Sequence, residues 1–256
     1  MSPQVSPHSR RAHTDRLLAA WLLLMVWAVL HQIYGADALA SPPATAERLL
    51  VLLTGPRLWP HAAVTFSVWL AAFALAAIAG VATGVLLGFS RIAGQVLEPF
   101  VTALASLPKV TLYPMVLLIF GLGLSSKLVF GFLHGVLPIL LFTLGAVRGM
   151  LLVHLKSARV LGLSRWTTMR RVMLPLLLPS LLSGLKLGAS LTLLGVLIGE
   201  MFGAQKGLGF LLMNAMELND TVNLAALSVL LLGVAIGLNA GFSILGQACS
   251  GVRACH

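Results

Sequence analysis

The sequence predicts an all-α protein that crosses a membrane about six times, and two observations support this prediction. Hydrophobic residues make up 59% of the 256 residues and charged residues only 9%, which gives a mean hydropathy of +0.99. A soluble domain of this length needs far more polar surface, so the solvent of most of the chain must be lipid. Apolar runs also alternate with short polar segments, and most of these runs are long enough to span a bilayer.

Each apolar run is an expected span. The runs lie at 17–34, 62–89, 110–124, 128–147, 174–199 and 222–248. The run 62–89 has no charge and is rich in Ala and Gly, which favours close helix packing in lipid. The run 110–124 is short and follows several prolines, so we expect a kinked helix that begins upstream near residue 96. The segments 35–60 and 200–223 are expected to be loops.

The expected organisation is a short N-terminal region followed by one membrane core. Residues 1–60 hold a tail, the first transmembrane helix and an external loop. Residues 61–250 form a core of five transmembrane helices with a cytoplasmic loop at 148–174, and residues 251–256 are a tail. No internal repeat is visible in the sequence.

The positive charges predict the orientation. The net charge is +10, but the basic residues lie between apolar runs rather than on a basic domain, which argues against nucleic acid as a partner. The loop between the fourth and fifth runs carries six basic residues and no acid: Arg148, Lys156, Arg159, Arg165, Arg170 and Arg171. This loop, Arg91 and both termini are therefore predicted to be cytoplasmic.

The cytoplasmic loop carries a family resemblance. Its residues Ala158, Gly162, Val172, Leu174 and Pro175 match the coupling signature of permeases of ATP-binding-cassette (ABC) importers, the binding-protein-dependent transport inner membrane components. Further stretches are similar to the subfamily for nitrate, sulfonates, taurine and vitamin precursors: 106–110, 120–123, 138–141, 199–201 and 207–209. The resemblance covers about residues 62–250, and the order of these short strings makes it specific.

The resemblance implies a type I importer permease fold and a set of partners. Two cytoplasmic ATPase subunits, a second permease copy in a homodimer and an external solute-binding protein are expected, in a bacterial inner membrane. The solute would be small and polar or anionic, and would cross by alternating access. The implied ATPase-coupling residues are Lys156, Ser157, Ala158, Arg159, Gly162, Ser164, Arg165, Trp166, Leu174 and Pro175. ATP and Mg are expected in the ATPase, because this chain lacks the Gly-x-x-x-x-Gly-Lys-Ser/Thr loop.

The physical character of the loop agrees with this reading. A short helix there would turn arginines outward and leave apolar residues that need a partner surface or the bilayer face. The alternative is a solvated loop on the membrane surface. The chain departs from the family pattern at Lys156 and Ser157, where Glu and Ala are usual. A charge of opposite sign is expected to change which ATPase fits.

Five other polar residues are candidates for the translocation pathway or for docking of the binding protein. They are Lys109, His134, Lys186, Glu200 and Asn214. Each has a plainer alternative: Lys186 can snorkel, His134 can bond a backbone carbonyl inside the core, and Glu200 can be a helix-end carboxylate in water. Cys249 and Cys255 lie in the tail and predict neither a metal site nor a disulfide.

Two other functional classes are alternatives. An intramembrane serine protease would need a Gly-x-Ser triplet, such as those that begin at Gly88, Gly123 and Gly162, to meet a histidine at the same depth, and none of these three obviously does. A secondary transporter would be expected to show inverted repeats and paired acids within spans, and neither is visible. A scaffold protein is the remaining option. We therefore expect no catalytic residues in this chain.

Overall fold

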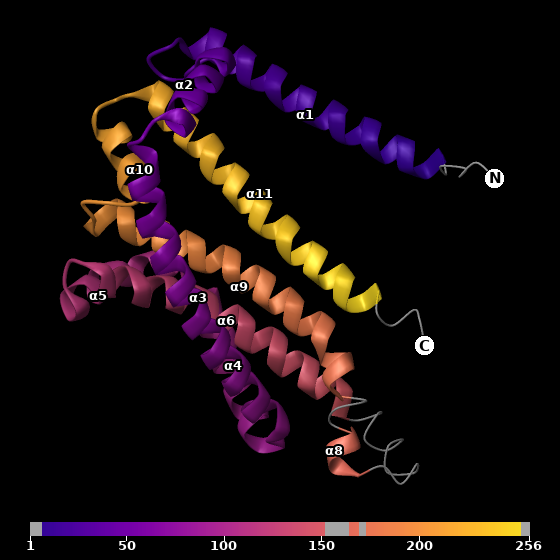
Figure 1. Cartoon of the computed structure of the whole chain (residues 1–256). Helices are drawn as coiled ribbons and strands as arrows, with labels where there is room; N and C mark the ends of the chain where they lie inside the picture. The colour runs from indigo at the N-terminus through magenta and orange to yellow at the C-terminus, as the bar shows by residue number, and fades with distance from the viewer. Residues whose placement is uncertain (1–6, 152–163, 169–172, 252–256) are drawn as a thin grey trace. The chain divides into compact units, whose positions relative to one another are not determined.

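The computed structural model describes residues 7–151, 164–168 and 173–251, and within these ranges the chain is helical with no strand (Figure 1). The long helices are α1 (Pro7–Tyr34), α3 (Leu58–Phe89), α6 (Leu124–Leu151), α9 (Leu174–Gly203) and α11 (Thr221–Gly251). The shorter ones are α2 (Pro42–Thr54), α4 (Arg91–Ser106), the 3-10 helix η1 (Lys109–Leu112), α5 (Tyr113–Phe120), α8 (Arg165–Thr168) and α10 (Leu208–Glu217).

The chain divides into two compact units. The first unit consists of Met1–Leu58 and Leu212–Leu231, and the second of Trp59–Leu211 and Leu232–His256. The second unit contains the core helices α3, α4, α5, α6 and α9 together with the later part of α11, so it holds most of the predicted site residues.

Four helices in the described part of the chain are long and apolar enough to cross a membrane: α3, α6, α9 and α11. A fifth span results if α4 and the segment Lys109–Phe120 are counted as one broken span, bent by 86°. The prediction of about six transmembrane spans therefore depends on whether α1 also crosses the membrane. Its apolar part, Leu18–Tyr34, is about 25 Å long at 1.5 Å per residue, near the lower limit for a span.

Glycines on α3 allow it to approach α6 closely. A Cβ on Gly80 would lie 2.9 Å from Ile139, one on Gly84 would lie 2.6 Å from the Cβ of Thr143, and one on Gly88 would lie 2.6 Å from Val147. The three glycines are spaced four residues apart, so they form one face of α3. The Ala/Gly-rich character of this run thus has the packing role that the sequence predicts.

The second close contact is between α6 and α9, which pack together along much of their length. Gly184 and Gly188 of α9 lie against Phe142 and Ile139 of α6, and a Cβ at either glycine would collide with these side chains. Nearer the other end, Gly195 of α9 lies against the backbone of α6. Without a hydrophobic force between helices in lipid, such small-residue contacts are what bring backbones together.

The bent pair differs from the prediction of one kinked helix beginning near residue 96. The first helix begins earlier, at Arg91, because the Ser90 hydroxyl accepts a hydrogen bond from Ala93 N at 3.3 Å. It ends at Ser106, before Pro108, whose ring disfavours helical geometry in the preceding residue. The two parts are therefore separate helices rather than one kinked rod.

The two segments predicted as loops both contain helices. In the first unit, Pro42 and Pro43 occupy the first turn of α2, where their missing N–H groups are not needed, and the Ser41 hydroxyl accepts from Ala44 N. The segment 200–223 contains α10, whose N-terminus is held by side chains from distant helices. The hydropathy pattern missed both helices because they are short and carry polar residues.

Candidate functional site

The predicted coupling segment lies largely outside the described residues. Lys156, Ser157, Ala158, Arg159 and Gly162 fall in this undescribed part. Of the remaining predicted coupling residues, Ser164 is exposed, and its hydroxyl accepts from Thr167 N at 3.2 Å, so it caps α8, the short helix that contains Arg165 and Trp166. Leu174 is 54% exposed, and Pro175 stands in the first turn of α9.

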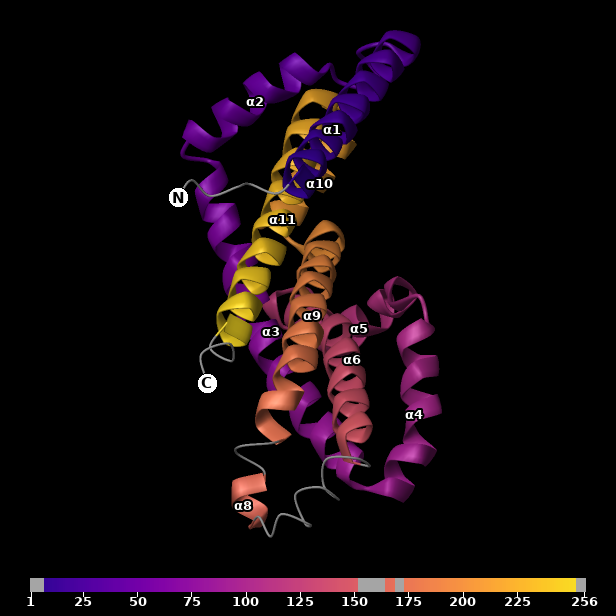
Figure 2. The same ribbon diagram turned by 90° about the vertical axis from the view of Figure 1, so that its right-hand side faces the viewer.

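The two ends of this segment are anchored in one small core. Val147 near the end of α6 packs with Met173 and Leu177 at the start of α9, and all three are buried. In Figures 1 and 2, four helix termini lie on the side of the second unit that carries α8. They are the end of α3, the start of α4, the end of α6 and the start of α9. Any motion imposed on the segment would therefore act directly on α6 and α9.

An ion pair not predicted from the sequence lies at the same end. The guanidinium of Arg148 on α6 donates to the Glu98 carboxylate on α4. A Cβ on Gly94 would collide with this guanidinium, so the glycine leaves room for it. The two charges are 50 positions apart in the sequence, and only the packing of α4 against α6 brings them together.

Glu200 lies at the opposite end of the second unit, and the alternative that it is a helix-end carboxylate in water is wrong. Its side chain is fully buried. The Thr65 hydroxyl on α3 donates to it at 2.8 Å, and Gly209 N donates to it at 3.0 Å. The buried carboxylate is thus satisfied by protein donors.

Three side chains hold the start of α10. Gly207 N donates to His61 Nδ1 at 3.1 Å, Leu208 N donates to Thr65 Oγ1 at 2.8 Å, and Gly209 N donates to Glu200. We call His61, Thr65 and Glu200 the α10 clamp. Three successive backbone N–H groups, which a helix start leaves without intrahelical partners, are therefore all bonded.

The Gly-Leu-Gly string at 207–209 has a geometric reason. Gly207 has a φ of +133°, and a Cβ there would run into the Glu200 carboxylate. Lys127 at the start of α6 is 4% exposed and has an electrostatic interaction with Glu200. His61, Thr65 and Lys127 were not among the predicted site residues, because nothing local in the sequence links them to Glu200.

His134 and Lys109 occupy packing positions in the described structure. The His134 side chain is 6% exposed, its Nδ1 lies 2.9 Å from the Phe130 carbonyl oxygen, and its ring packs edge-on against Phe130. Lys109 lies at the break between α4 and α5 and donates to the Ala105 carbonyl at 3.0 Å. Asn214 is exposed on α10.

Lys186 lies near the middle of α9, twelve residues after Leu174 in a helix of 30 residues. Its ammonium donates to the Ser243 hydroxyl on α11 at 2.9 Å. Asn239 of α11 donates to Ser190 of α9 at 3.3 Å. We call these four residues the polar seam. A charged residue at the centre of a membrane helix costs about 2.5–3.5 kcal/mol, so its retention calls for a reason.

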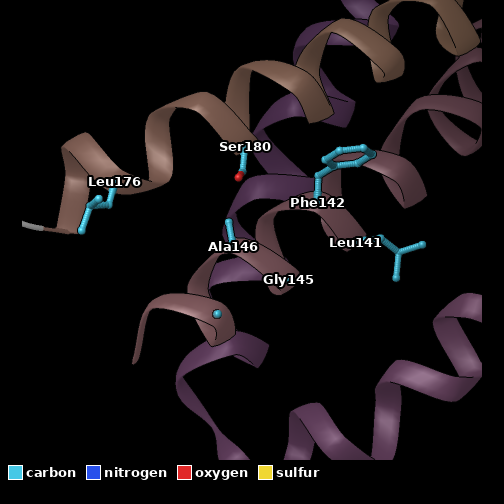
Figure 3. Close-up of a pocket in the computed structure, with 7 residues that line it drawn as sticks. Leu141, Phe142, Gly145, Ala146, Leu176 and Ser180 are labelled. Carbon is cyan, nitrogen blue, oxygen red and sulfur yellow. The ribbon is translucent and has the colours of Figure 1, made fainter. Parts of the chain in front are cut away.

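A groove opens between α6 and α9, near the end of α6 and the start of α9 (Figure 3). Its volume is about 610 Å³, and it is lined by Leu141, Phe142, Gly145, Ala146, Gly149, Leu176 and Ser180. Ser180 contributes its one side-chain hydroxyl. Within the ranges that the structure describes, no cluster of three or more His, Cys, Asp or Glu residues could hold a metal.

Comparison with known proteins adds independent information. The sequence profile of the family described as "Binding-protein-dependent transport system inner membrane component" matches residues 73–249. A riboflavin transport system permease protein of Chloroflexus aurantiacus is 36% identical over 82% of this chain and 81% of its own length. A taurine transport system permease protein of Escherichia coli is 26% identical over 90% of this chain and 84% of its own length. A nitrate import permease protein of Leptolyngbya laminosa is 29% identical over 88% of this chain and 84% of its own length.

Solved structures give the same fold. A structure of the MetNI methionine ABC transporter in an inward-facing conformation matches with a TM-score of 0.64. The match covers 77% of this chain and 99% of that chain at 20% identity, so it bears on the fold alone. The chain thus has the fold of a type I ABC importer permease.

Proposed function

This chain belongs to the family of binding-protein-dependent transport system inner membrane components, and from that premise we propose how its parts serve import. It is the permease subunit of an ABC importer for a small solute, a multi-pass protein of the inner membrane. We propose that two copies form one pathway as a homodimer, with two ATPase subunits on the cytoplasmic side and a solute-binding protein outside. In this arrangement both termini would be cytoplasmic, as the positive-inside rule predicts.

The coupling end would be the end of the second unit that carries α8. The segment between α6 and α9 begins and ends in one buried cluster formed by Val147, Met173 and Leu177. A partner that moves this segment would displace α6 and α9 together, since tightly packed helices shift as units rather than deform. ATP and Mg would bind in the partner ATPase.

The solute would be small and polar or anionic. Support comes from relatives whose names specify taurine and nitrate, while another specifies riboflavin. Alternating access would be driven by ATP bound to the partner rather than by chemistry in this chain. Among the predicted pathway residues, Lys186 has the position that best fits this role, because it lies deep in a span and forms no ion pair with an acid in the described part of the chain.

The opposite end would face the solute-binding protein. Asn214 is exposed on α10 and remains a docking candidate. Glu200 is buried beneath the start of α10, so it would support the docking surface rather than contact the binding protein.

The match of the family profile over residues 73–249 carries this proposal. It is tested by co-purifying the chain with its candidate ATPase from membranes and measuring ATP hydrolysis, for wild type and for Gly162→Trp. We expect the ATPase to co-purify with the wild-type chain but not with Gly162→Trp, because an indole in the coupling segment would block docking of the ATPase.

Gly123→Trp is the matched control. It places the same indole in the turn before α6, at the other end of the second unit, where a Cβ meets nothing within 4 Å. This variant is expected to keep the ATPase. Purification of the wild-type chain without any ATPase, or equal loss in both variants, would refute the coupling assignment.

A further inference from the structure

The polar seam between α9 and α11 contains a cation with no acidic partner. The chain has seven acidic residues in all, and α11 contains none of them. The one acid on α9 is Glu200, which lies roughly 21 Å along the helix from Lys186 at 1.5 Å per residue and is bonded in the α10 clamp. Neither helix of the seam can therefore neutralise Lys186 locally.

The other members of the seam have used their hydrogen-bond donors. Ser243 donates to the Asn239 carbonyl at 2.8 Å, and Ser190 donates to the Lys186 carbonyl at 3.2 Å. The Asn239 amide donates both to Ser190 and to the Ala235 carbonyl. An ammonium has three donors, and the described residues accept one of them, at Ser243. Two donors of Lys186 remain for something that is not part of this helix pair.

The seam lies on the face of α9 that points away from α6. Gly184 and Gly188 face α6, and residues two positions further along a helix point about 200° away. Lys186 and Ser190 are in that position. Around them on the same face, Ser183, Leu187 and Leu194 are exposed. Lys186 is therefore partly exposed beside exposed side chains, on the side of α9 that is turned away from α6.

We propose that Lys186 is the residue that receives the anionic group of the transported solute, with Ser190, Asn239 and Ser243 positioning it. A small oxyanion, or the anionic end of a zwitterion, would supply the acceptors that the two remaining N–H donors need. Ser243 holds the ammonium at mid-helix, so that it does not extend toward the membrane surface. The inference rests on the proposed function, because it places the pathway of the permease along this face of α9.

The test uses thiol labelling, so the solute itself does not have to be identified first. The two native cysteines are replaced (Cys249→Ser and Cys255→Ser), and Ser183→Cys is introduced one turn before Lys186, where the side chain is exposed and belongs to no seam bond. The full chain is labelled in membranes, alone and with its ATPase trapped by vanadate. The reagents are the anionic sulfonatoethyl and the cationic trimethylammonioethyl methanethiosulfonates.

Each labelling rate is divided by the rate of the same reagent with a small thiol in solution, because a thiolate reacts faster with a cationic reagent than with an anionic one. We expect this normalised rate to be about tenfold higher for the anionic reagent in at least one of the two states, because the nearby ammonium attracts it. The preference should vanish in Lys186→Met and persist in Lys186→Arg, which keeps the charge. Millimolar nitrate or methanesulfonate should slow labelling in the Lys186 protein and not in Lys186→Met.

Two results would overturn the proposal. Absence of labelling by either reagent in both states would mean that this face is dry, and Lys186 would then only join α9 to α11. Equal normalised rates for the two reagents, unchanged by Lys186→Met, would mean that the face is open to water but does not select anions. Failure of the ATPase to co-purify would count against the proposed function and not against the role of Lys186. Labelling of the chain alone does not require the ATPase, so it tests Lys186 separately.

Discussion

At the scale of single residues, the α10 clamp shows how a carboxylate becomes acceptable inside a membrane protein. An ionised group away from water is costly unless its lone pairs are filled. Glu200 is bonded by the Thr65 hydroxyl and by Gly209 N, with Lys127 as the nearby cation. Because Thr65 also accepts from Leu208 N, the two side chains act as one unit.

We therefore predict that Glu200→Ala destabilises the protein by about 2 kcal/mol or more, because it leaves two buried donors unpaired at roughly 1–3 kcal/mol each. The free energy of unfolding in detergent, followed by tryptophan fluorescence, measures this. Limited proteolysis should also cut faster near residues 203–208. Glu217→Ala is the control, since Glu217 is exposed at the end of α10. Equal stability of the two variants would contradict the clamp.

At the scale of helices, contacts through glycine determine how closely α3, α6 and α9 approach one another. Gly84 is the most informative position, because a Cβ there would lie 2.6 Å from the Thr143 Cβ and 2.8 Å from the Leu140 carbonyl oxygen. Neither atom is the far end of a flexible side chain. The helices would have to separate to admit even one methyl group.

Gly84→Ala is expected to lower stability by about 1–3 kcal/mol, the usual cost of overpacking, despite the better helix propensity of alanine. The measurement is the unfolding midpoint in detergent together with the yield of folded protein. Gly145→Ala is the matched control on α6, where a Cβ meets nothing within 4 Å. A Gly84→Ala protein as stable as that control would mean that α3 and α6 are not held at this distance.

The Arg148–Glu98 ion pair also belongs to the scale of helices, and we predict a small effect. The two side chains are 24% and 48% exposed, so water screens the attraction. A double-mutant cycle of Arg148→Ala and Glu98→Ala should give a coupling of about 0.2–1 kcal/mol in unfolding free energy. A coupling several times larger would show that α4 is held to α6 mainly by this contact.

At the scale of the whole molecule, the distribution of basic residues predicts which segments face the cytoplasm and which face outward. Ser164 lies in the strongly basic coupling segment, and Glu217 follows the α10 clamp in the sequence; both are exposed. The positive-inside rule predicts that the first faces the cytoplasm and the second faces outward.

The expected labelling follows from that rule. With Cys249 and Cys255 replaced by Ser, an impermeant maleimide should label Glu217→Cys in intact spheroplasts, and Ser164→Cys only after permeabilisation. A protein that keeps native Cys255 and carries Cys249→Ser should behave like Ser164→Cys, since the C-terminus is predicted to be inside. The reverse pattern would invert the orientation.

The sequence alone determined the class of the protein, the long spans and the family. Hydropathy reports which stretches need lipid, and it located α3, α6, α9 and α11 because each of them is apolar over most of its length. The coupling string around Gly162 and the Gly-Leu-Gly string at 207–209 identified the family because they are local patterns, readable without knowing any contact.

Only the tertiary structure decided which polar residues meet. Thr65 and Glu200 are 135 positions apart, and Lys186 and Ser243 are 57 apart. Glu200, for which a carboxylate in water was one alternative, is buried, and α2 and α10 stand where loops were expected. The physical reason is that hydropathy fixes the solvent of a helix but not its rotation about its own axis. That rotation is set by close packing of residues such as Gly84 and Gly188, which depends on partners far away in the chain.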